Sequence, residues 1–445
     1  MPYFFWNCFL FLISIGILIT VHEFGHFWVA RKFNVHVEKF SIGIGKVIWS
    51  FFDKNGTEYA ISIFPLGGYV KMLDKNLVSN KKLQTFNEQY FWKKLIIIIS
   101  GPLHNFLFSI ILFWGIFILG MPSHKVIIQN IIPNSIAEKS GIHPSMEIKE
   151  INGIKVSDWN IVYDNLKNDT IVMKLMHPIN LVMIEKKIKR TNIKNNFDHY
   201  DPIINFGIIP LIPNIETRID SIEPDSPAMK SGFQKGDKII KINNFEIKDS
   251  WYLLSYLLRN NPNKKLIIDV ERNGKLIQIE VLSGTKIINN IQEGFLGISP
   301  KIRPISEEYK TSIYYNPIEA LYVAFNKVIH IILMIFNMLG KLFIGHVTLN
   351  NLHGPISIAK NISSSIKHGI VHYIILLSFI SINLGVINLI PIPILDGGHI
   401  LFLIIEKLIR VPIPKKIQTI SYQVGFFIIV TLMTISILND LFKIK

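Results

Sequence analysis

Four long apolar runs predict that the chain crosses a membrane. Each is long enough to span a bilayer as a helix, for which about 20 apolar residues suffice. Between them lie stretches rich in Lys, Asn and Asp, which predict extramembrane loops and domains. The pattern predicts a polytopic α-helical membrane protein with four transmembrane helices, at residues 3–30, 95–120, 370–394 and 417–438.

A fifth apolar run, at residues 318–344, has a different pattern. Charged or titratable side chains recur along its length, namely Glu319, Lys327, His330 and Lys341. Such recurrence is typical of an amphipathic helix that lies in the membrane interface. We therefore expect an interfacial helix within a connecting region at 303–369.

The distribution of charge predicts the orientation of the spans. Residues 31–94 carry 11 Lys or Arg against 5 Asp or Glu, whereas residues 1–21 carry no charge. Because cytoplasmic loops have an excess of Lys and Arg, this loop is expected in the cytoplasm. A second basic segment, at 407–416, precedes the fourth span. Both termini and residues 122–316 are then expected on the outer side.

An internal repeat occupies the polar middle of the chain. Residues 133–141 align with 224–232 at an offset of 91 residues. Two tandem copies of one small domain are implied. The predicted organisation is 1–121 for spans one and two, 122–213 and 214–302 for the two copies, 303–369 for the interfacial region, and 370–445 for spans three and four.

The second copy contains the phrase P-x-S-P-A-x-x-x-G-x-x-x-G-D-x-I-x-x-I-N, which resembles bacterial PDZ domains. The resemblance implies two PDZ-like α+β domains, with a sheet edge that captures extended peptides. The first copy has Ser145-Met146 where the second has Gly236-Asp237, so peptide binding is less expected in the first copy.

Composition and charge indicate which binding partners to expect. The net charge of +15 could indicate nucleic acid, but the lysines are scattered through loops and form no basic patch with interleaved aromatic residues. An anionic membrane surface accounts for the charge better, so we expect contact with membrane lipid and none with nucleic acid. The single cysteine, Cys8, excludes an intramolecular disulfide and a CxxC metal site.

The first span contains a metal-binding pattern, His22-Glu23-Phe24-Gly25-His26. One helical turn separates the two histidines, so both imidazoles can reach one zinc ion, and Glu23 lies beside them to handle a water proton. Polar groups at membrane depth are costly to bury and usually bind a partner or take part in chemistry. The pattern therefore predicts a zinc hydrolase with His22 and His26 as ligands and Glu23 as the catalytic base.

The third span brings further polar residues to the same depth. It carries Asn383 and Asn388, and it leads through Pro391 and Pro393 to Asp396. A catalytic zinc needs three protein ligands, so we expect Asp396 to be the third. The poorer candidates are His104, His399 and Glu406.

Two strand-like runs between residues 57 and 73 predict a hairpin near the zinc site. An unwound substrate could add to the edge of such a hairpin, with Gly67, Gly68, Tyr69, Asn388 and Asn383 as candidate substrate contacts. A purely structural sheet is an equally good interpretation of the sequence.

These motifs together resemble the site-2 protease class of intramembrane zinc metalloproteases, and within it the bacterial members of the sigma-E envelope stress response. The resemblance rests on the HExxH pattern and on the runs 40–46, 65–73, 354–359 and 388–398. Ile44 departs from it, because an aromatic residue is expected there.

The resemblance implies an enzyme that cleaves single-span membrane proteins within the bilayer, namely a pre-trimmed anti-sigma factor and remnant signal peptides. It implies Zn2+ as cofactor and the bacterial inner membrane as location, with both termini and the PDZ-like domains on the periplasmic side. Two alternatives fit the sequence less well. A metal transporter would have ligands strung across the bilayer, and a peptide-binding scaffold would not need Glu23.

Overall fold

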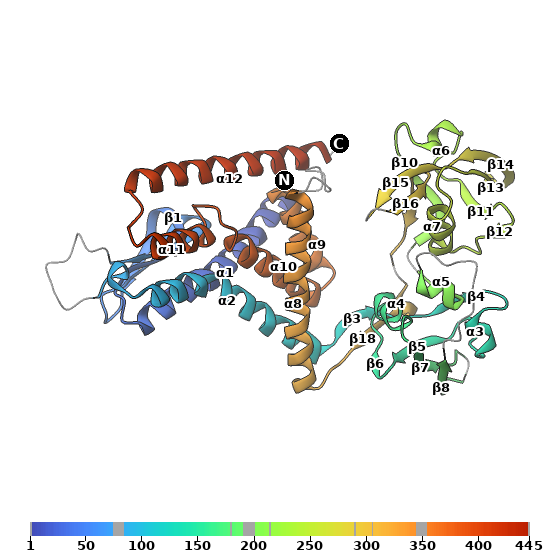
Figure 1. Ribbon diagram of the computed structural model, residues 1–445, viewed down its shortest axis with the longest axis horizontal. Coiled ribbons are helices and arrows are strands. Elements are labelled where there is room, and N and C mark those ends of the chain that lie inside the picture. Colours follow the sequence, from blue (N-terminus) through green and yellow to red (C-terminus); the bar gives the residue numbers. More distant parts are fainter. Residues whose placement is uncertain are drawn as a thin grey trace. The chain divides into compact units, whose positions relative to one another are not determined.

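The computed structural model describes residues 2–73, 84–178, 180–189, 201–212, 215–288, 291–304, 306–343 and 354–443. The chain divides into two compact units. Residues 1–121 and 314–445 form the membrane unit, and residues 122–313 form the second unit (Figure 1).

The membrane unit is mainly helical and contains one small sheet. Its elements are α1 (Pro2–Lys32), β1 (Val37–Phe52), β2 (Glu58–Met72), the 3-10 helix η2 (Phe86–Glu88), α2 (Phe91–Leu119), α8 (Pro317–Phe343), α9 (Pro355–Lys367), α10 (Ile370–Asn388), α11 (Asp396–Ile409) and α12 (Lys415–Lys443).

Five helices of the described chain are long and apolar enough to cross a membrane. Four of them, α1, α2, α10 and α12, coincide with the predicted spans, which confirms a multi-pass membrane protein. The third span is shorter than predicted, because α10 ends at Asn388 and not at Ile394. Pro391 and Pro393 follow directly, and proline supplies no N–H to continue a helix.

The fifth candidate span is α8, which the sequence placed in the interface. One stripe of α8 is buried against α2 and α10, comprising Ala320, Ala324, Val328 and Ile331. Much of its remaining surface is exposed and apolar, including Leu321, Tyr322, Phe325, Leu333 and Phe336. In Figure 1, α8 runs across the direction of α12. By length and composition α8 could still span, so the count of four is not confirmed.

The two runs predicted to form a hairpin do not pair with each other, because residues 37–42 of β1 lie between them. Residues 37–42 pair with 68–72 of β2 on one side, residues 39–42 pair with 58–61 on the other, and residues 47–52 pair with 58–62. The chain can fold back within β1 because Gly43 and Gly45 adopt positive φ angles of 91° and 96°, which glycine tolerates best. Residues 68–72 therefore form an edge strand.

The second unit is rich in β-structure and contains two lobes, each with its own hydrophobic core. The first lobe contains β4 (Ile128–Ile131), α3 (Ile136–Lys139), β5 (Glu147–Ile151), β6 (Ile154–Lys155), α4 (Trp159–Asn165), β7 (Thr170–Met176), β8 (Met183–Lys189), α5 (Pro202–Phe206) and β9 (Ile208–Pro210). The second lobe contains β10 (Ile215–Ile222), α6 (Pro227–Lys230), β11 (Lys238–Ile242), β12 (Phe245–Glu246), α7 (Trp251–Arg259), β13 (Lys265–Arg272), β14 (Lys275–Leu282), β15 (Gly284–Ile288), β16 (Ile291–Phe295) and β17 (Ile298–Ile302). The remaining elements are β3 (Met121–His124), η3 (Glu307–Tyr309) and β18 (Lys310–Ile313), and β3 pairs with β18.

The two lobes repeat the same strand order. The first has β6-β5-β7-β8, and the second has β12 and β13 beside β11, with β14 beside β13. Corresponding turns share their backbone: Asn152 and Asn243 have φ angles of 50° and 51°, and Ser145 and Gly236 both have positive φ. The predicted domain boundary at 213–214 lies outside the described residues.

Candidate metal centre

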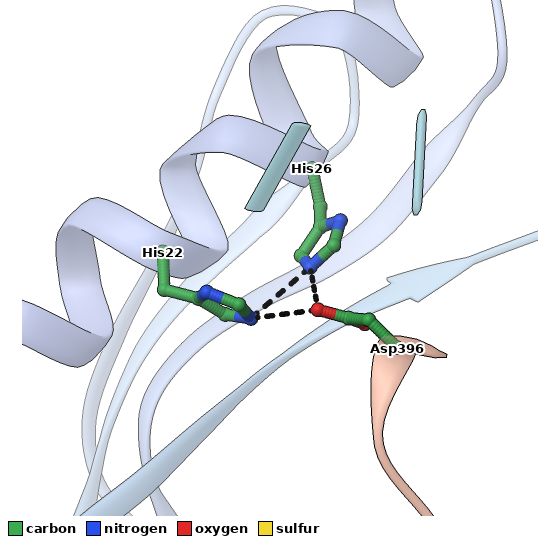
Figure 2. Close-up of side chains that lie close together, drawn as sticks. All are labelled: His22, His26 and Asp396. Carbon is green, nitrogen blue, oxygen red and sulfur yellow. Dashed lines mark hydrogen bonds and ion pairs between the residues drawn. The ribbon is translucent and has the colours of Figure 1, made fainter. Parts of the chain in front are cut away.

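The two histidines of the HExxH pattern lie on one face of α1 and are both buried. His22 is 7% exposed and His26 is 9% exposed. Their Nε2 atoms are 3.3 Å apart, as expected for residues one helical turn apart on one face. Figure 2 shows both rings pointing toward the Asp396 side chain.

The backbone of α2 fixes the protonation of His26. Its Nδ1 lies 2.8 Å from the carbonyl oxygen of Ile97, which can only accept a hydrogen bond. Nδ1 therefore carries the ring proton of a neutral imidazole, and Nε2 presents its lone pair. This is the form in which histidine binds a metal.

A tight turn between α10 and α11 positions Asp396. The turn is closed by a hydrogen bond from the Leu395 N–H to the Ile392 carbonyl oxygen, at 2.8 Å. A Cβ on Gly397 would lie 2.3 Å from the Ile390 carbonyl oxygen, and one on Gly398 would lie 2.3 Å from that of Ile392. Glycine is needed at both positions for this close approach, which places Asp396 in the first turn of α11.

The three side chains fit a tetrahedral zinc ion. Asp396 Oδ2 lies 3.1 Å from His22 Nε2 and 3.4 Å from His26 Nε2. Bonds of about 2.0–2.1 Å in a tetrahedral site place neighbouring ligand atoms about 3.3–3.4 Å apart. Asp396 Oδ2 is buried and has no hydrogen-bond partner among the described residues, and it faces the lone pair of His26 Nε2. A cation between these atoms would resolve the repulsion, so the residues present fit the group.

The close approach of α2 to α1 depends on glycine. A Cβ on Gly101 would lie 2.2 Å from His26 Nε2 and 2.9 Å from His22 Cε1. A Cβ on Gly25 would lie 2.3 Å from the Ser100 carbonyl oxygen. The two helices therefore meet directly beside the imidazoles, as small residues allow in membrane helix pairs.

The three side chains open onto a cavity of about 1000 Å³, which Glu23 also lines. The edge strand 68–72 closes one side of the cavity, because a Cβ on Gly68 would lie 2.9 Å from Glu23 Cγ. The β1–β2 sheet is held there by a buried cluster that includes Phe27 of α1, Phe40 of β1 and Ile97 of α2.

The predicted substrate contacts divide into two groups. Gly67, Gly68, Tyr69 and Asn388 line the cavity, and Asn388 Nδ2 lies 3.4 Å from His22 Nε2. Asn383 is exposed, is not among the described residues that line the cavity, and donates to the Phe379 carbonyl oxygen of its own helix.

The poorer ligand candidates lie elsewhere or have other partners. His104 Nδ1 lies 2.8 Å from the Ser100 carbonyl oxygen of its own helix. The carboxylate of Glu406 accepts a hydrogen bond from the Ile413 N–H. His399 lines the cavity, but its ring packs against Tyr422. Among the described residues, the only group of three or more His, Cys, Asp or Glu side chains positioned to hold one metal ion is His22, His26 and Asp396.

Comparison with known proteins identifies the family of the chain. Residues 10–432 match Peptidase family M50. The chain is 42% identical over 443 residues to "Protease RseP" of Yersinia pestis, with 98% of both chains covered. It is 40% identical over 449 residues to "Regulator of sigma-E protease RseP" of Escherichia coli K12, again with 98% of both covered. It is 38% identical over 448 residues to "Regulator of sigma E protease" of Haemophilus influenzae, covering 99% of this chain and all of the relative. The chain therefore belongs to peptidase family M50, the site-2 protease class of zinc metalloproteases.

Proposed function

We propose that this protease cleaves single-span membrane proteins within the bilayer, using His22, His26 and Asp396 as zinc ligands and Glu23 as the catalytic base. One observation carries the proposal. Three buried ligand atoms converge at the distances of a tetrahedral zinc site, beside a glutamate that faces the same cavity. The three ligands leave a fourth position open, as a hydrolytic zinc site requires.

The chemistry divides between the metal and Glu23. When bound, zinc acts as a Lewis acid and lowers the pKa of water to about 7. The Glu23 carboxylate takes the proton from the attacking water and returns it to the leaving amide nitrogen. Its position on α1, next to His22 and against Gly68, holds the carboxylate at the cavity.

The edge strand 68–72 is proposed to hold the substrate. Peptide carbonyls in a transmembrane helix are tied into hydrogen bonds, so the helix must unwind before it can be attacked. Residues 68–72 pair with β1 on one side, and Gly68, Tyr69 and Val70 line the cavity. An unwound segment can add to this edge as a strand, and the Asn388 amide can bind a substrate carbonyl.

The membrane arrangement is proposed from the charge pattern. In this arrangement the protein lies in the bacterial inner membrane with four spans, and α8 lies in the interface. Both termini and residues 122–313 face the periplasm, while the β1–β2 sheet faces the cytoplasm. The charged residues that recur along α8, Glu319, Lys327 and Lys341, support its interfacial placement.

The two lobes of residues 122–313 are proposed to be PDZ-like domains that select substrates without taking part in the chemistry. Two relatives are named as regulators of sigma-E, which supports a pre-trimmed anti-sigma factor as one substrate. Remnant signal peptides are proposed as a second substrate class, because they too are short single-span segments.

Co-expression with tagged single-span membrane proteins tests the proposal. Wild type should convert a candidate whose outer domain has been removed into a shorter product, and Glu23→Gln should leave that candidate uncut. Equal cleavage by both proteins would contradict the role of Glu23. A cut outside the membrane-spanning segment would contradict intramembrane proteolysis.

A further inference from the structure

Asn105 is a fully buried polar residue next to the metal centre that the proposed function does not use. It lies on α2, one turn after Gly101, and its exposed fraction is 0%. Its Nδ2 lies 3.2 Å from Nδ1 of His22, on the side of the ring opposite the ligand atom. Its Oδ1 is buried and has no hydrogen-bond partner among the described residues. A buried amide oxygen without a partner costs about 1–3 kcal/mol.

The backbone of Asn105 is fixed between helices. Ser381 of α10 donates its hydroxyl hydrogen bond to the Asn105 carbonyl oxygen at 2.9 Å, and Ser109 of α2 donates to the same oxygen at 2.9 Å. These bonds hold the Asn105 backbone in place, and its buried side chain reaches His22 from there.

Zinc binding decides which end of that amide faces His22. An imidazole that binds zinc through Nε2 carries its ring proton on Nδ1, so Nδ1 becomes a donor and needs an acceptor. Two N–H donors facing each other at 3.2 Å would repel. A half-turn of the amide exchanges Nδ2 and Oδ1, and it brings the unpartnered oxygen to the Nδ1 proton.

We propose that Asn105 is a positioning residue whose Oδ1 accepts a hydrogen bond from Nδ1–H of His22 and so holds Nε2 toward the metal. The proposal rests on the ligand assignment given above. It gives the two histidines equivalent supports from α2, since the Ile97 carbonyl oxygen plays this part for His26. The difference is that only the support of His22 is a side chain, which can be replaced.

Zinc affinity of the full-length purified protein, measured by competition with a chromogenic chelator, tests the proposal. Asn105→Leu keeps the size of the side chain but removes the acceptor, and zinc binding should weaken roughly 10–100-fold. Asn105→Asp keeps an acceptor and has no donor, and it should bind zinc at least as tightly as wild type. The visible absorption of the cobalt-substituted protein should change in Asn105→Leu and stay close to wild type in Asn105→Asp.

Ser378→Ala is the matched control. Ser378 is fully buried on α10, and its hydroxyl donates to the Ile374 carbonyl oxygen of its own helix, so zinc affinity should not change. The proposal is overturned if Asn105→Leu binds zinc as wild type does, or if Ser378→Ala weakens binding equally. If Asn105→Leu does not fold, Asn105→Asp decides alone, because weaker binding would show that Nδ2 and not Oδ1 serves His22. His22→Ala separates the two proposals, since undiminished zinc affinity in that variant would contradict the ligand set itself.

Discussion

Gly101→Ala adds one methyl group at the point where α2 meets the imidazoles of His22 and His26. The added carbon would lie 2.2 Å from His26 Nε2 and 2.6 Å from His26 Cε1. To reach an ordinary contact distance of 3.4 Å, the ring or the helix must move by about 1.2 Å. Metal ligands tolerate displacements of about 0.2 Å, so the ring cannot move this far and remain a ligand.

The free-energy cost of Gly101→Ala can be compared with the usual effect of a Gly→Ala substitution in a helix. Overpacking a tight site costs about 1–3 kcal/mol. If that cost falls on the metal-bound form, zinc affinity drops roughly 5- to 150-fold, since about 1.4 kcal/mol corresponds to a factor of ten. In an open helical position, Gly→Ala instead stabilises by about 0.5–1 kcal/mol. Gly115 of α2 is such a position, because no atom of the described residues lies within 4 Å of its added Cβ.

The assay compares Gly101→Ala with Gly115→Ala in the purified protein. Zinc affinity is measured by chelator competition, and cleavage of a single-span substrate is measured in membranes. Gly101→Ala should lose both zinc affinity and cleavage, and Gly115→Ala should retain both. Wild-type zinc affinity in Gly101→Ala, or equal losses in both variants, would refute the close packing of α2 against the imidazoles.

Two further predictions concern topology and the second lobe. In a chain without its native cysteine, a cysteine at Lys54 should be labelled from the cytoplasm and cysteines at Lys275 and Lys341 from the outer side; labelling of position 341 from the cytoplasm would make α8 a fifth span. In the second lobe, Arg272 forms hydrogen bonds of 2.7 and 2.8 Å with the carboxylate of Asp237, which is 1% exposed. Arg272→Ala should therefore destabilise that lobe by about 3 kcal/mol, measured by amide hydrogen exchange in β11 and β13. Adding Asp237→Met should restore protection, and unchanged exchange in Arg272→Ala would contradict the prediction.

The local patterns predicted which side chains lie together in the candidate metal centre. The spacing of His22 and His26 requires only helix geometry, so their shared face follows from the sequence. Asp396 is distant in sequence, but burying a carboxylate at membrane depth costs free energy, and this cost predicted that Asp396 has a partner. The structure places its Oδ2 atom 3.1 Å from His22 Nε2. Membership in a peptidase family removes the metal-transporter alternative.

Contacts that depend on how two helices pack were beyond the sequence. Asn105 lies in the second predicted span, but only the packing of α2 on α1 shows that its side chain contacts His22. Asn383 and Asn388 share one helix and a similar polarity, yet only Asn388 faces the cavity. The rotation of α10 about its axis separates them, and hydropathy does not report that rotation.

The internal repeat was predicted in part from the sequence. The repeat predicted two copies of one small domain, and the structure adds that Ser145 of the first lobe and Gly236 of the second both have positive φ angles. The sequence did not reveal why the first copy lacks an aspartate. In the structure, Met146 fills the core of the first lobe at that position, whereas Asp237 of the second lobe pairs with Arg272.

Zinc content and proteolysis, measured together on three proteins, test the central claim most directly. Wild type should hold one zinc ion and cut a pre-trimmed single-span substrate. Glu23→Gln should retain the zinc and lose the cleavage, because the base is not a ligand and Gln cannot accept the water proton. Asp396→Asn should lose both, because the third ligand is weakened. Full zinc affinity in Asp396→Asn, or appreciable cleavage by Glu23→Gln, would contradict the account.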